Sequence, residues 1–426
     1  MTLSLFDDIP VANSIANKLA IVDQPVHDWY RFVLSFPAHI VRDYLRRWNI
    51  SSNQCVLDPF CGTGSTLVEA KKLGVHSVGI EANPVAQFAA STKLDWTPDP
   101  DGILMHAEEV AIAAQEIITE WKNTPLLTLP GDSMSLLLTN SISPLPLHKI
   151  LVLRHCLSEM RHPQFYAHEQ LALVKTAVAT ASNLKFGPEV GVSATHKTDA
   201  PVVEAWLKNV RAMVGDLRTV AQCPPATSEV IRGDARDPGQ YIAPASVDAV
   251  FTSPPYPNEK DYSRTTRLEM VLLGFAKDKN DLRSIKQELL RSNTRNVYKG
   301  DNDDAWVEQF AVVQQIADDI ERRRIDLGKT SGFERMYPKV TKLYFGGMAR
   351  HLAALRSILR PGAYLGYVVG DQASYLRVMI RTGNVLSEIA EALGYELLGI
   401  DLFRTRLATA TREMLREEVV ILRWRG

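Results

Sequence analysis

The sequence predicts a doubly wound α/β fold, with a mostly parallel, seven-stranded sheet and two large helical insertions. A short apolar run (QCVLDPF, 54–60), a glycine turn, an amphipathic segment and a second apolar run (HSVGIEANP, 76–84) indicate strand, turn, helix and strand. Long helical and charged stretches separate this opening from later strands. The strand signal returns at 229–236, 246–256, 362–371 and 417–426, and residues 385–403 read as a helix followed by a strand.

The order of these signals divides the chain into five parts. Residues 1–95 hold an N-terminal segment and the first half of the sheet, and residues 226–262 and 341–426 hold the rest of it. Residues 96–225 and 263–340 are the two helical insertions. The periodicity of the first insertion predicts helices over Gly102–Lys122, Pro146–Met160, Phe165–Asn183 and Pro201–Gln222.

Composition limits the class of protein. The 48 Lys and Arg nearly balance the 49 Asp and Glu, so nucleic-acid binding would depend on local basic patches. No apolar run approaches the roughly 20 residues that a membrane helix needs. The four cysteines show no paired spacing and no secretory signal precedes them, so we expect reduced thiols in a cytoplasmic protein. The histidines near Cys156 do not match zinc spacing, and no metal is expected.

A glycine turn (LDPFCGTGS) places Gly62 and Gly64 between a predicted strand and a predicted helix. Glycines there let a ligand approach the backbone, and the helix N-terminus offers free N–H groups. Nucleotide, flavin and S-adenosylmethionine sites share this arrangement. A dinucleotide fingerprint would have a third glycine where this chain has Leu67, and a phosphate-binding loop would end in Gly-Lys-Ser/Thr.

Three acidic residues follow successive predicted strands. Asp58 would repel a pyrophosphate and attract an ammonium group, Glu81 can accept hydrogen bonds from ribose hydroxyls, and Asp234 can accept one from an adenine amine. Taken singly, Asp58 and Asp234 also fit ordinary strand-end caps. Because parallel strands end at one edge of a sheet, the three together favour a cofactor with cationic groups and no phosphate. S-adenosylmethionine has this character.

The segments DPFCGTGS and TSPPY together resemble the S-adenosylmethionine-dependent DNA amino-methyltransferases, which methylate cytosine N4 or adenine N6. The resemblance covers the sheet and implies the Rossmann-like methyltransferase fold, with the motif order of the non-permuted classes. FPAHIVRDYLRRW is similar to the family's methionine-side segment. The cofactor residues that the resemblance and the acids imply are Phe36, Pro37, His39, Asp58, Phe60, Gly62, Gly64, Glu81, Asp234 and Thr252.

The TSPPY motif implies a catalytic group of Ser253, Pro254, Pro255 and Tyr256. An exocyclic amine is a poor nucleophile because its lone pair is delocalised into the ring. The Ser253 hydroxyl and the Pro254 carbonyl can hold its two N–H bonds, and the prolines keep that carbonyl rigid. Tyr256 can stack on a base that has left the duplex.

Alternatives remain at this stage. Serine in the first position of the motif favours cytosine N4, and adenine N6 is the runner-up. An RNA guanine-N2 methyltransferase also carries a DPFCGTGS-like segment but usually has Asp-Pro-Pro-Tyr and an N-terminal RNA-binding domain. A S-adenosylmethionine-binding regulatory subunit without turnover would have no need of the intact TSPPY acceptor pair.

Double-stranded DNA is the expected partner, in a restriction–modification or defence system with a cognate endonuclease, and nucleoid association would follow. The second insertion, with its Arg, Lys and aromatic residues, is the expected DNA-recognition region, with Arg291 and Arg295 as phosphate contacts. The N-terminal TLSLFDD is similar to the Gln-Leu-Ser-Leu-Phe peptide that docks on the replication sliding clamp. It would make Leu3, Leu5 and Phe6 a clamp contact, although Thr2 replaces the glutamine.

Overall fold

The computed structural model describes residues 21–31, 36–121, 124–187, 189–258, 260–407 and 413–426. The clamp-like segment with Leu3, Leu5 and Phe6 lies outside these residues. Within them, the main sheet has seven strands in the order β5-β2-β1-β6-β7-β9-β8, and only β9 runs antiparallel to its neighbours. The strands are β1 (Cys55–Asp58), β2 (His76–Glu81), β5 (Ser228–Arg232), β6 (Val247–Thr252), β7 (Leu359–Gly370), β8 (Glu396–Leu407) and β9 (Met414–Arg423).

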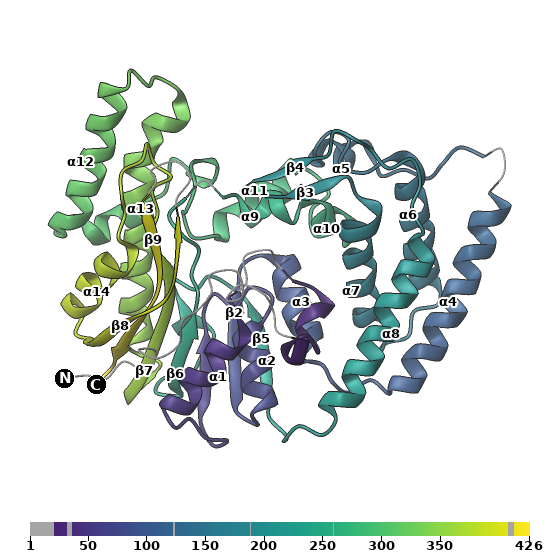
Figure 1. Ribbon diagram of the computed structural model, residues 1–426, viewed down its shortest axis with the longest axis horizontal. Coiled ribbons are helices and arrows are strands. Elements are labelled where there is room, and N and C mark those ends of the chain that lie inside the picture. The colour runs from purple at the N-terminus through teal and green to yellow at the C-terminus, as the bar shows by residue number, and fades with distance from the viewer. Residues whose placement is uncertain (1–20, 32–35, 122–123, 188, 259, 408–412) are drawn as a thin grey trace.

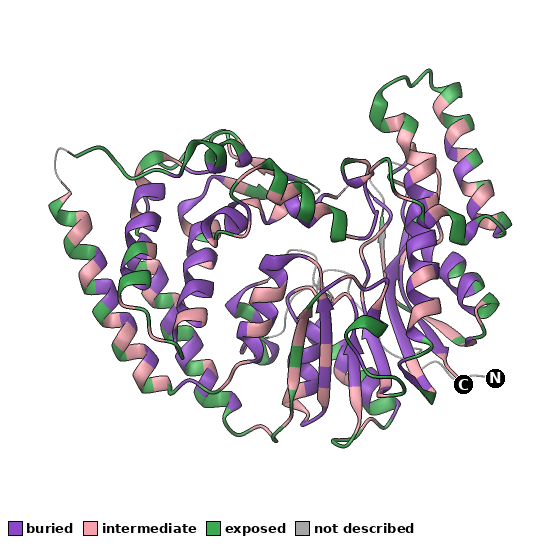
Figure 2. Cartoon of the chain, turned by 180° about the vertical axis from the view of Figure 1, so that it is seen from behind, coloured by how far each residue is buried: buried purple, intermediate pink, exposed green. Residues whose placement is uncertain are grey.

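Helices cover both faces of this sheet (Figure 1). Tyr44 and Trp48, at the end of α1, pack with Phe251 of β6 on one face, where α2 also lies. Apolar residues of α13 and α14 pack on the other face. Because both faces are covered, the central strands β1 and β6 are almost continuously buried (Figure 2). The flanking helices are α1 (Ala38–Arg47), α2 (Ser65–Lys72), α3 (Pro84–Leu94), α13 (Gly332–Leu355) and α14 (Thr382–Ala392).

The first insertion forms a helical bundle beside the sheet, at the right of Figure 1. Its apolar residues join those of α2 and α3 in one buried cluster, so the bundle extends the core. Trp206 is fully buried there, and its indole N–H donates to the carbonyl of Glu169 at 3.0 Å. The bundle contains α4 (Pro100–Glu120), α5 (Gly131–Leu136), α6 (Pro144–Glu159), α7 (Tyr166–Thr176) and α8 (Val202–Val220).

The first insertion differs from the sequence prediction between its third and fourth helices. The expected helix over Phe165–Asn183 ends as a π-helical turn at Ala177–Ala181. A β-hairpin follows, formed by β3 (Leu184–Phe186) and β4 (Val190–Val192). Each strand has only three residues, too few for a detectable alternation of apolar and polar side chains. The other three predicted helices are confirmed within about two residues as α4, α6 and α8.

The second insertion runs from the TSPPY segment after β6 back to the sheet. It contains α9 (Tyr262–Thr265), α10 (Arg267–Leu272), α11 (Lys279–Glu288) and α12 (Ala311–Asp326), with single 3-10 turns at Thr294–Asn296 and Asp303–Val307. Helix α13 then crosses the expected boundary at residue 340 and belongs to both the insertion and the core. In the described residues, no helix is both long and apolar enough to span a membrane.

A close backbone approach holds the second insertion on α13. A Cβ at Gly346 would lie 1.9 Å from the carbonyl oxygen of Asp303, which is too close for any side chain. Only glycine, which has no Cβ, fits at this position. We therefore expect Gly346→Ala to lower the free energy of unfolding by about 1–3 kcal/mol, despite alanine's better helix propensity. Gly332→Ala at the first residue of the same helix meets nothing within 4 Å and is the control. Urea unfolding of both variants checks this, and equal stability would contradict it.

Candidate active site

A cavity of about 730 Å³ opens at the carboxyl edge of the sheet, where β1, β2, β5 and β6 end. The structure brings nine of the fourteen sequence-predicted site residues to its wall. They are Phe36, Phe60, Gly62, Glu81, Asp234, Ser253, Pro254, Pro255 and Tyr256. The other five, Pro37, His39, Asp58, Gly64 and Thr252, do not line it. His39 is an exposed residue of α1, whereas Asp58 and Thr252 are fully buried.

The two glycines of the turn do different things. Gly62 has φ +51°, and a Cβ there would meet nothing within 4 Å, so its backbone faces open cavity space. Gly64 has φ +84° and begins α2, and a Cβ there would lie 3.1 Å from the Cβ of Ala90. Gly62 is therefore the residue that leaves room for a ligand, and Gly64 allows α2 and α3 to pack closely.

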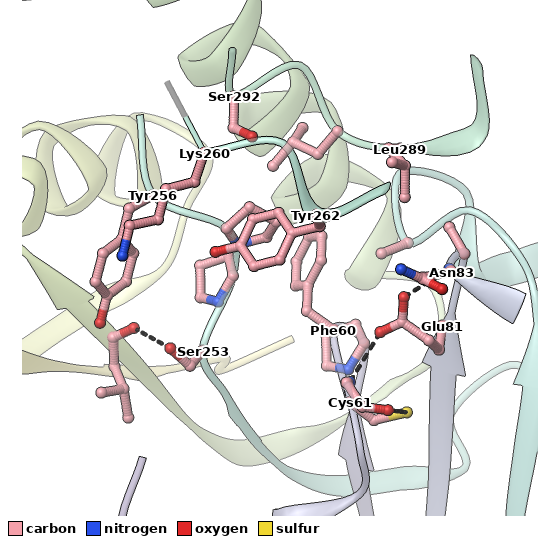
Figure 3. A pocket seen from close by; sticks show the side chains of 18 of the residues that line it. Phe60, Cys61, Glu81, Asn83, Ser253, Tyr256, Lys260, Tyr262, Leu289 and Ser292 are labelled. Atoms are coloured by element: carbon pink, nitrogen blue, oxygen red, sulfur yellow. Dashed lines mark hydrogen bonds between the residues drawn. The ribbon is translucent and has the colours of Figure 1, made fainter. Parts of the chain in front are cut away.

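Glu81 ties the turn to the neighbouring strand (Figure 3). One carboxylate oxygen accepts the backbone N–H of Gly62 at 2.8 Å, and the other accepts that of Asn83 at 2.7 Å. Burial nevertheless raises the pKa of Glu81 to about 7. Each oxygen keeps a second lone pair, so the side chain can still accept hydrogen bonds from a ligand in the cavity.

Asp58 lies beneath the cavity rather than in its wall. Its Oδ1 accepts the Thr252 hydroxyl at 2.6 Å and the Phe60 N–H at 3.2 Å. Burial raises the pKa of Asp58 to about 6. In this arrangement Asp58 braces the ends of β1 and β6 against each other.

Asp234 does line the cavity, but its carboxylate is already paired. Both oxygens accept from the guanidinium of Arg236, at distances of 2.6–3.0 Å. Arg236 is itself 7% exposed and also pairs with Asp303 of the second insertion. The loop after β5 is thereby linked to the insertion by buried ion pairs.

His351 on α13 also holds the loop after β5 in place, through a hydrogen bond to Ala235. Its Nδ1 lies 2.6 Å from the carbonyl oxygen of Ala235, which can only accept, so the proton is on Nδ1. Its Nε2 then accepts the Tyr367 hydroxyl at 2.8 Å. The imidazole also meets the ring of Phe60 edge-on, at 5.0 Å between centroids. Burial lowers the pKa of His351 to about 4, so the folded protein holds it neutral.

The TSPPY segment follows β6, and Ser253 and Tyr256 line the cavity (Figure 3). The Ser253 hydroxyl donates to the carbonyl oxygen of Val368 on β7 at 3.1 Å. Tyr256 lies against Gly370, where a Cβ would approach the tyrosine ring to 3.2 Å. Burial raises the pKa of Tyr256, so the phenol stays protonated.

Other cavity residues were not found by sequence reasoning. The second insertion contributes Tyr262, Leu289, Leu290 and Ser292, and the β3–β4 hairpin contributes Glu189. The segment after β7 contributes Gln372, β8 contributes Arg404, and β9 contributes Glu417. None of them belongs to a motif, and no periodic pattern points to the cavity. Their position depends on how distant segments fold over the sheet edge, which a local pattern does not encode.

Arg291 and Arg295, the expected phosphate contacts, have different surroundings. Arg291 is 3% exposed, pairs with both oxygens of Asp301 and donates to backbone carbonyls of α11 and Leu289. The prediction of a DNA contact is therefore wrong for Arg291, because its guanidinium is enclosed by the protein. Arg295 is accessible and lies 3.5 Å from Glu189, which links the two insertions.

The charges around the cavity indicate what it can hold. Among the described lining residues, five are acidic (Glu81, Glu189, Asp234, Glu288 and Glu417) and two are basic (Lys260 and Arg404). Four of these acids, Glu189, Asp234, Glu288 and Glu417, are each paired with an arginine. Glu81 is therefore the lining acid without a salt bridge among the described residues, and its carboxylate favours a cationic ligand over a phosphate. Phe60, Ile80 and Leu289 add apolar surface. The set fits S-adenosylmethionine, and no group of three His, Cys, Asp or Glu in the described chain could hold a metal ion.

Comparisons with known proteins agree with this chemistry. A family model described as DNA methylase matches residues 20–90. The Type II methyltransferase M.BsoBI of Geobacillus stearothermophilus is 25% identical over 96% of this chain and 85% of that protein. The Type II methyltransferase M.AvaI of Anabaena variabilis is 29% identical over a segment that covers 39% of this chain and 34% of M.AvaI. These matches support the prediction that this chain is a DNA methyltransferase of the amino-methyltransferase type.

The methyltransferase therefore uses S-adenosylmethionine as its cofactor. Among solved structures, TrmN from Thermus thermophilus is 10% identical, with a TM-score of 0.29 over 91% of this chain and 48% of that one. The rRNA methyltransferase aviRa from Streptomyces viridochromogenes has the same score and identity over 93% and 87%. At these scores the overlap adds nothing to the strand order, which by itself has the expected Rossmann-like arrangement.

The buried neutral His351 predicts a loss of stability in acid. Its folded pKa of about 4 lies below the ordinary value of 6.5, so the unfolded chain binds the proton more tightly. The stabilisation is complete above pH 6.5 and is lost as the pH falls towards 4, by about 3 kcal/mol at most. Urea unfolding at pH 7 and pH 4.5 should show a steeper loss for the native protein than for His351→Gln. An equal loss of unfolding free energy between pH 7 and pH 4.5 in the native protein and in His351→Gln would contradict this role of His351.

Proposed function

We propose that this DNA methyltransferase transfers the methyl group of S-adenosylmethionine to the exocyclic N4 amine of cytosine in duplex DNA. The target base is flipped out of the helix into the cavity, because an amine inside a stacked, paired duplex is not accessible to a buried site. The biological setting is restriction–modification or defence, in agreement with the Type II methyltransferases that the chain resembles.

The observation that carries the proposal is the hydrogen bond of Ser253. A hydroxyl has one hydrogen and two lone pairs, and the hydrogen is used by the carbonyl of Val368. Ser253 lines the cavity, and its Oγ keeps lone pairs with which it can accept a hydrogen bond. The neighbouring Pro254 has no N–H and a fixed φ, so it adds a second rigid acceptor, its carbonyl. Two acceptors suit the two N–H bonds of a primary amine.

Hydrogen bonds from both N–H groups favour tetrahedral geometry at the amine nitrogen. The lone pair is then less delocalised into the ring and more available for attack on the methyl group. Tyr256 supplies an aromatic face on which the flipped base can stack, and this offsets part of the unstacking cost. Phe36, Phe60, Gly62, Glu81 and Asp234 are the residues that would hold S-adenosylmethionine, which supplies an activated methyl group on its sulfonium. Alignment of amine and methyl group then accounts for much of the rate.

Cytosine is favoured over adenine by the neutral acceptor in the first position of the motif. Ser253 accepts through a hydroxyl, which places no fixed charge beside the pyrimidine carbonyl. The family resemblance associates serine with cytosine more often than with adenine. Adenine N6 methylation is the second candidate, and it requires no other change in the proposed roles.

The cofactor role of Glu81 predicts weaker binding when its carboxylate is removed. Glu81→Ala should reduce S-adenosylmethionine affinity more than about tenfold in calorimetry, as expected for losing hydrogen bonds to a charged group. Glu288→Ala is the control, since Glu288 lines the same cavity but pairs at the surface with Arg232. A folded Glu81→Ala protein with unchanged affinity would remove Glu81 from the site.

The acceptor role of Ser253 predicts a loss of turnover without a loss of cofactor binding. Ser253→Ala should lower kcat by a factor on the order of 10², because the acceptor acts mainly in the transition state. Mass spectrometry of nucleosides from treated DNA identifies the product. N6-methyladenine as the sole product would overturn the cytosine assignment and leave the acceptor pair standing. Methylation of RNA alone would overturn the DNA substrate.

A further inference from the structure

Three strands place a row of residues beside the catalytic motif. In the sheet, Gly370 of β7 pairs with Glu417 of β9, and Glu417 pairs on its other side with Arg404 of β8. A β-bulge between Leu402 and Arg404 shifts the register of β8 at this point. Bulges commonly redirect a side chain next to a functional site. Both Glu417 and Arg404 line the cavity.

The side chains of this row meet the catalytic tyrosine. A Cβ at Gly370 would lie 3.2 Å from Tyr256 Cε2, 3.3 Å from Glu417 Cγ and 3.6 Å from Gln372 Nε2. Tyr256, Glu417 and Gln372 therefore converge above one glycine. Ser253 is bonded to Val368, two residues before that glycine on the same strand. The row is thus part of the wall that a base stacked on Tyr256 would face.

Arg404 has a guanidinium nitrogen, Nη1, that is an unused hydrogen-bond donor among the described residues. Its Nε and Nη2 are held by the Glu417 carboxylate, with Nη2 and Oε2 in direct ion-pair contact. Its Nη1 is buried and has no acceptor among the described residues. A buried donor without a partner is unfavourable, so an acceptor from a ligand would be bound strongly. Because Glu417 balances its charge, the pair suits a neutral base better than a phosphate.

The two candidate bases differ in the acceptors that follow the amine along the ring edge. Cytosine presents a ring nitrogen and then a carbonyl oxygen, whereas adenine presents a ring nitrogen and then a C–H. A donor that reaches the second position therefore distinguishes the two. We propose that Arg404 is a specificity-determining residue whose Nη1 donates to the ring carbonyl of the flipped cytosine. Glu417 is the positioning residue that holds its guanidinium. This proposal rests on the proposed cytosine N4 activity.

The test combines a protein change with a substrate change. The recognition sequence is first mapped by modified-base sequencing of DNA from cells expressing the protein. Duplexes are then made with the target cytosine or with a 2-aminopyridine C-nucleoside, which keeps the amine and adjacent ring nitrogen but lacks the carbonyl. Initial rates give kcat/KM for the native protein and for Arg404→Lys, which keeps the positive charge beside Glu417. Arg425→Lys is the matched control, since Arg425 pairs with Glu396 away from the cavity.

The native protein and Arg425→Lys should prefer cytosine over the analogue by about tenfold or more, as expected for a hydrogen bond to a charged donor. Arg404→Lys should reduce that preference to about threefold or less, with unchanged S-adenosylmethionine affinity. An equal loss on both substrates would make Arg404 a structural residue and overturn the proposal. Equal kcat/KM of the native protein on cytosine and on the analogue would also overturn the proposal, and this outcome does not depend on whether the variant folds. Native protein that methylates only adenine would overturn the proposed function itself.

Discussion

The hydrogen bonds that the Glu81 carboxylate accepts from Gly62 and Asn83 hold the site together. They join the turn after β1, the end of β2 and the start of α3, which are separate in the chain. Asp58 makes a similar link between β1 and β6 through Thr252. Burial raises the pKa values of both acids, to about 7 and about 6. The carboxylates are therefore costly to bury in charged form, and a cationic ligand would relieve part of that cost.

Both insertions take part in the site, and neither is a simple appendage. The second insertion provides Leu289 and Leu290 to the cavity and is anchored by the Arg236–Asp303 ion pair and by the close packing at Gly346. The first insertion reaches the cavity through Glu189 of its hairpin. Arg295 of the second insertion contacts Glu189 of the first, so segments that lie more than a hundred residues apart in the chain meet beside the cavity.

The part of the cavity lined by Ser253 and Arg404 contains polar groups that are held by other residues of the protein. Ser253 is committed as a donor to Val368, and Arg404 is committed to Glu417. Each leaves a defined hydrogen-bonding group, an acceptor in one case and a donor in the other. In the proposed activity, such a site would select a base by the pattern of donors and acceptors on the edge of the base rather than by size alone.

The sequence by itself determined the strand and glycine-turn pattern, the acids at the strand ends and the TSPPY motif. These are local signals, because strand burial, turn geometry and a proline pair are encoded within a few neighbouring residues. Only the tertiary structure decided that Asp58 and Thr252 lie beneath the cavity while Glu81 and Asp234 line it. It also decided that Arg291 is enclosed and that Arg404 and Glu417 lie beside Tyr256. Exposure and pairing depend on which distant segments cover a residue, and the charge of a side chain does not specify them.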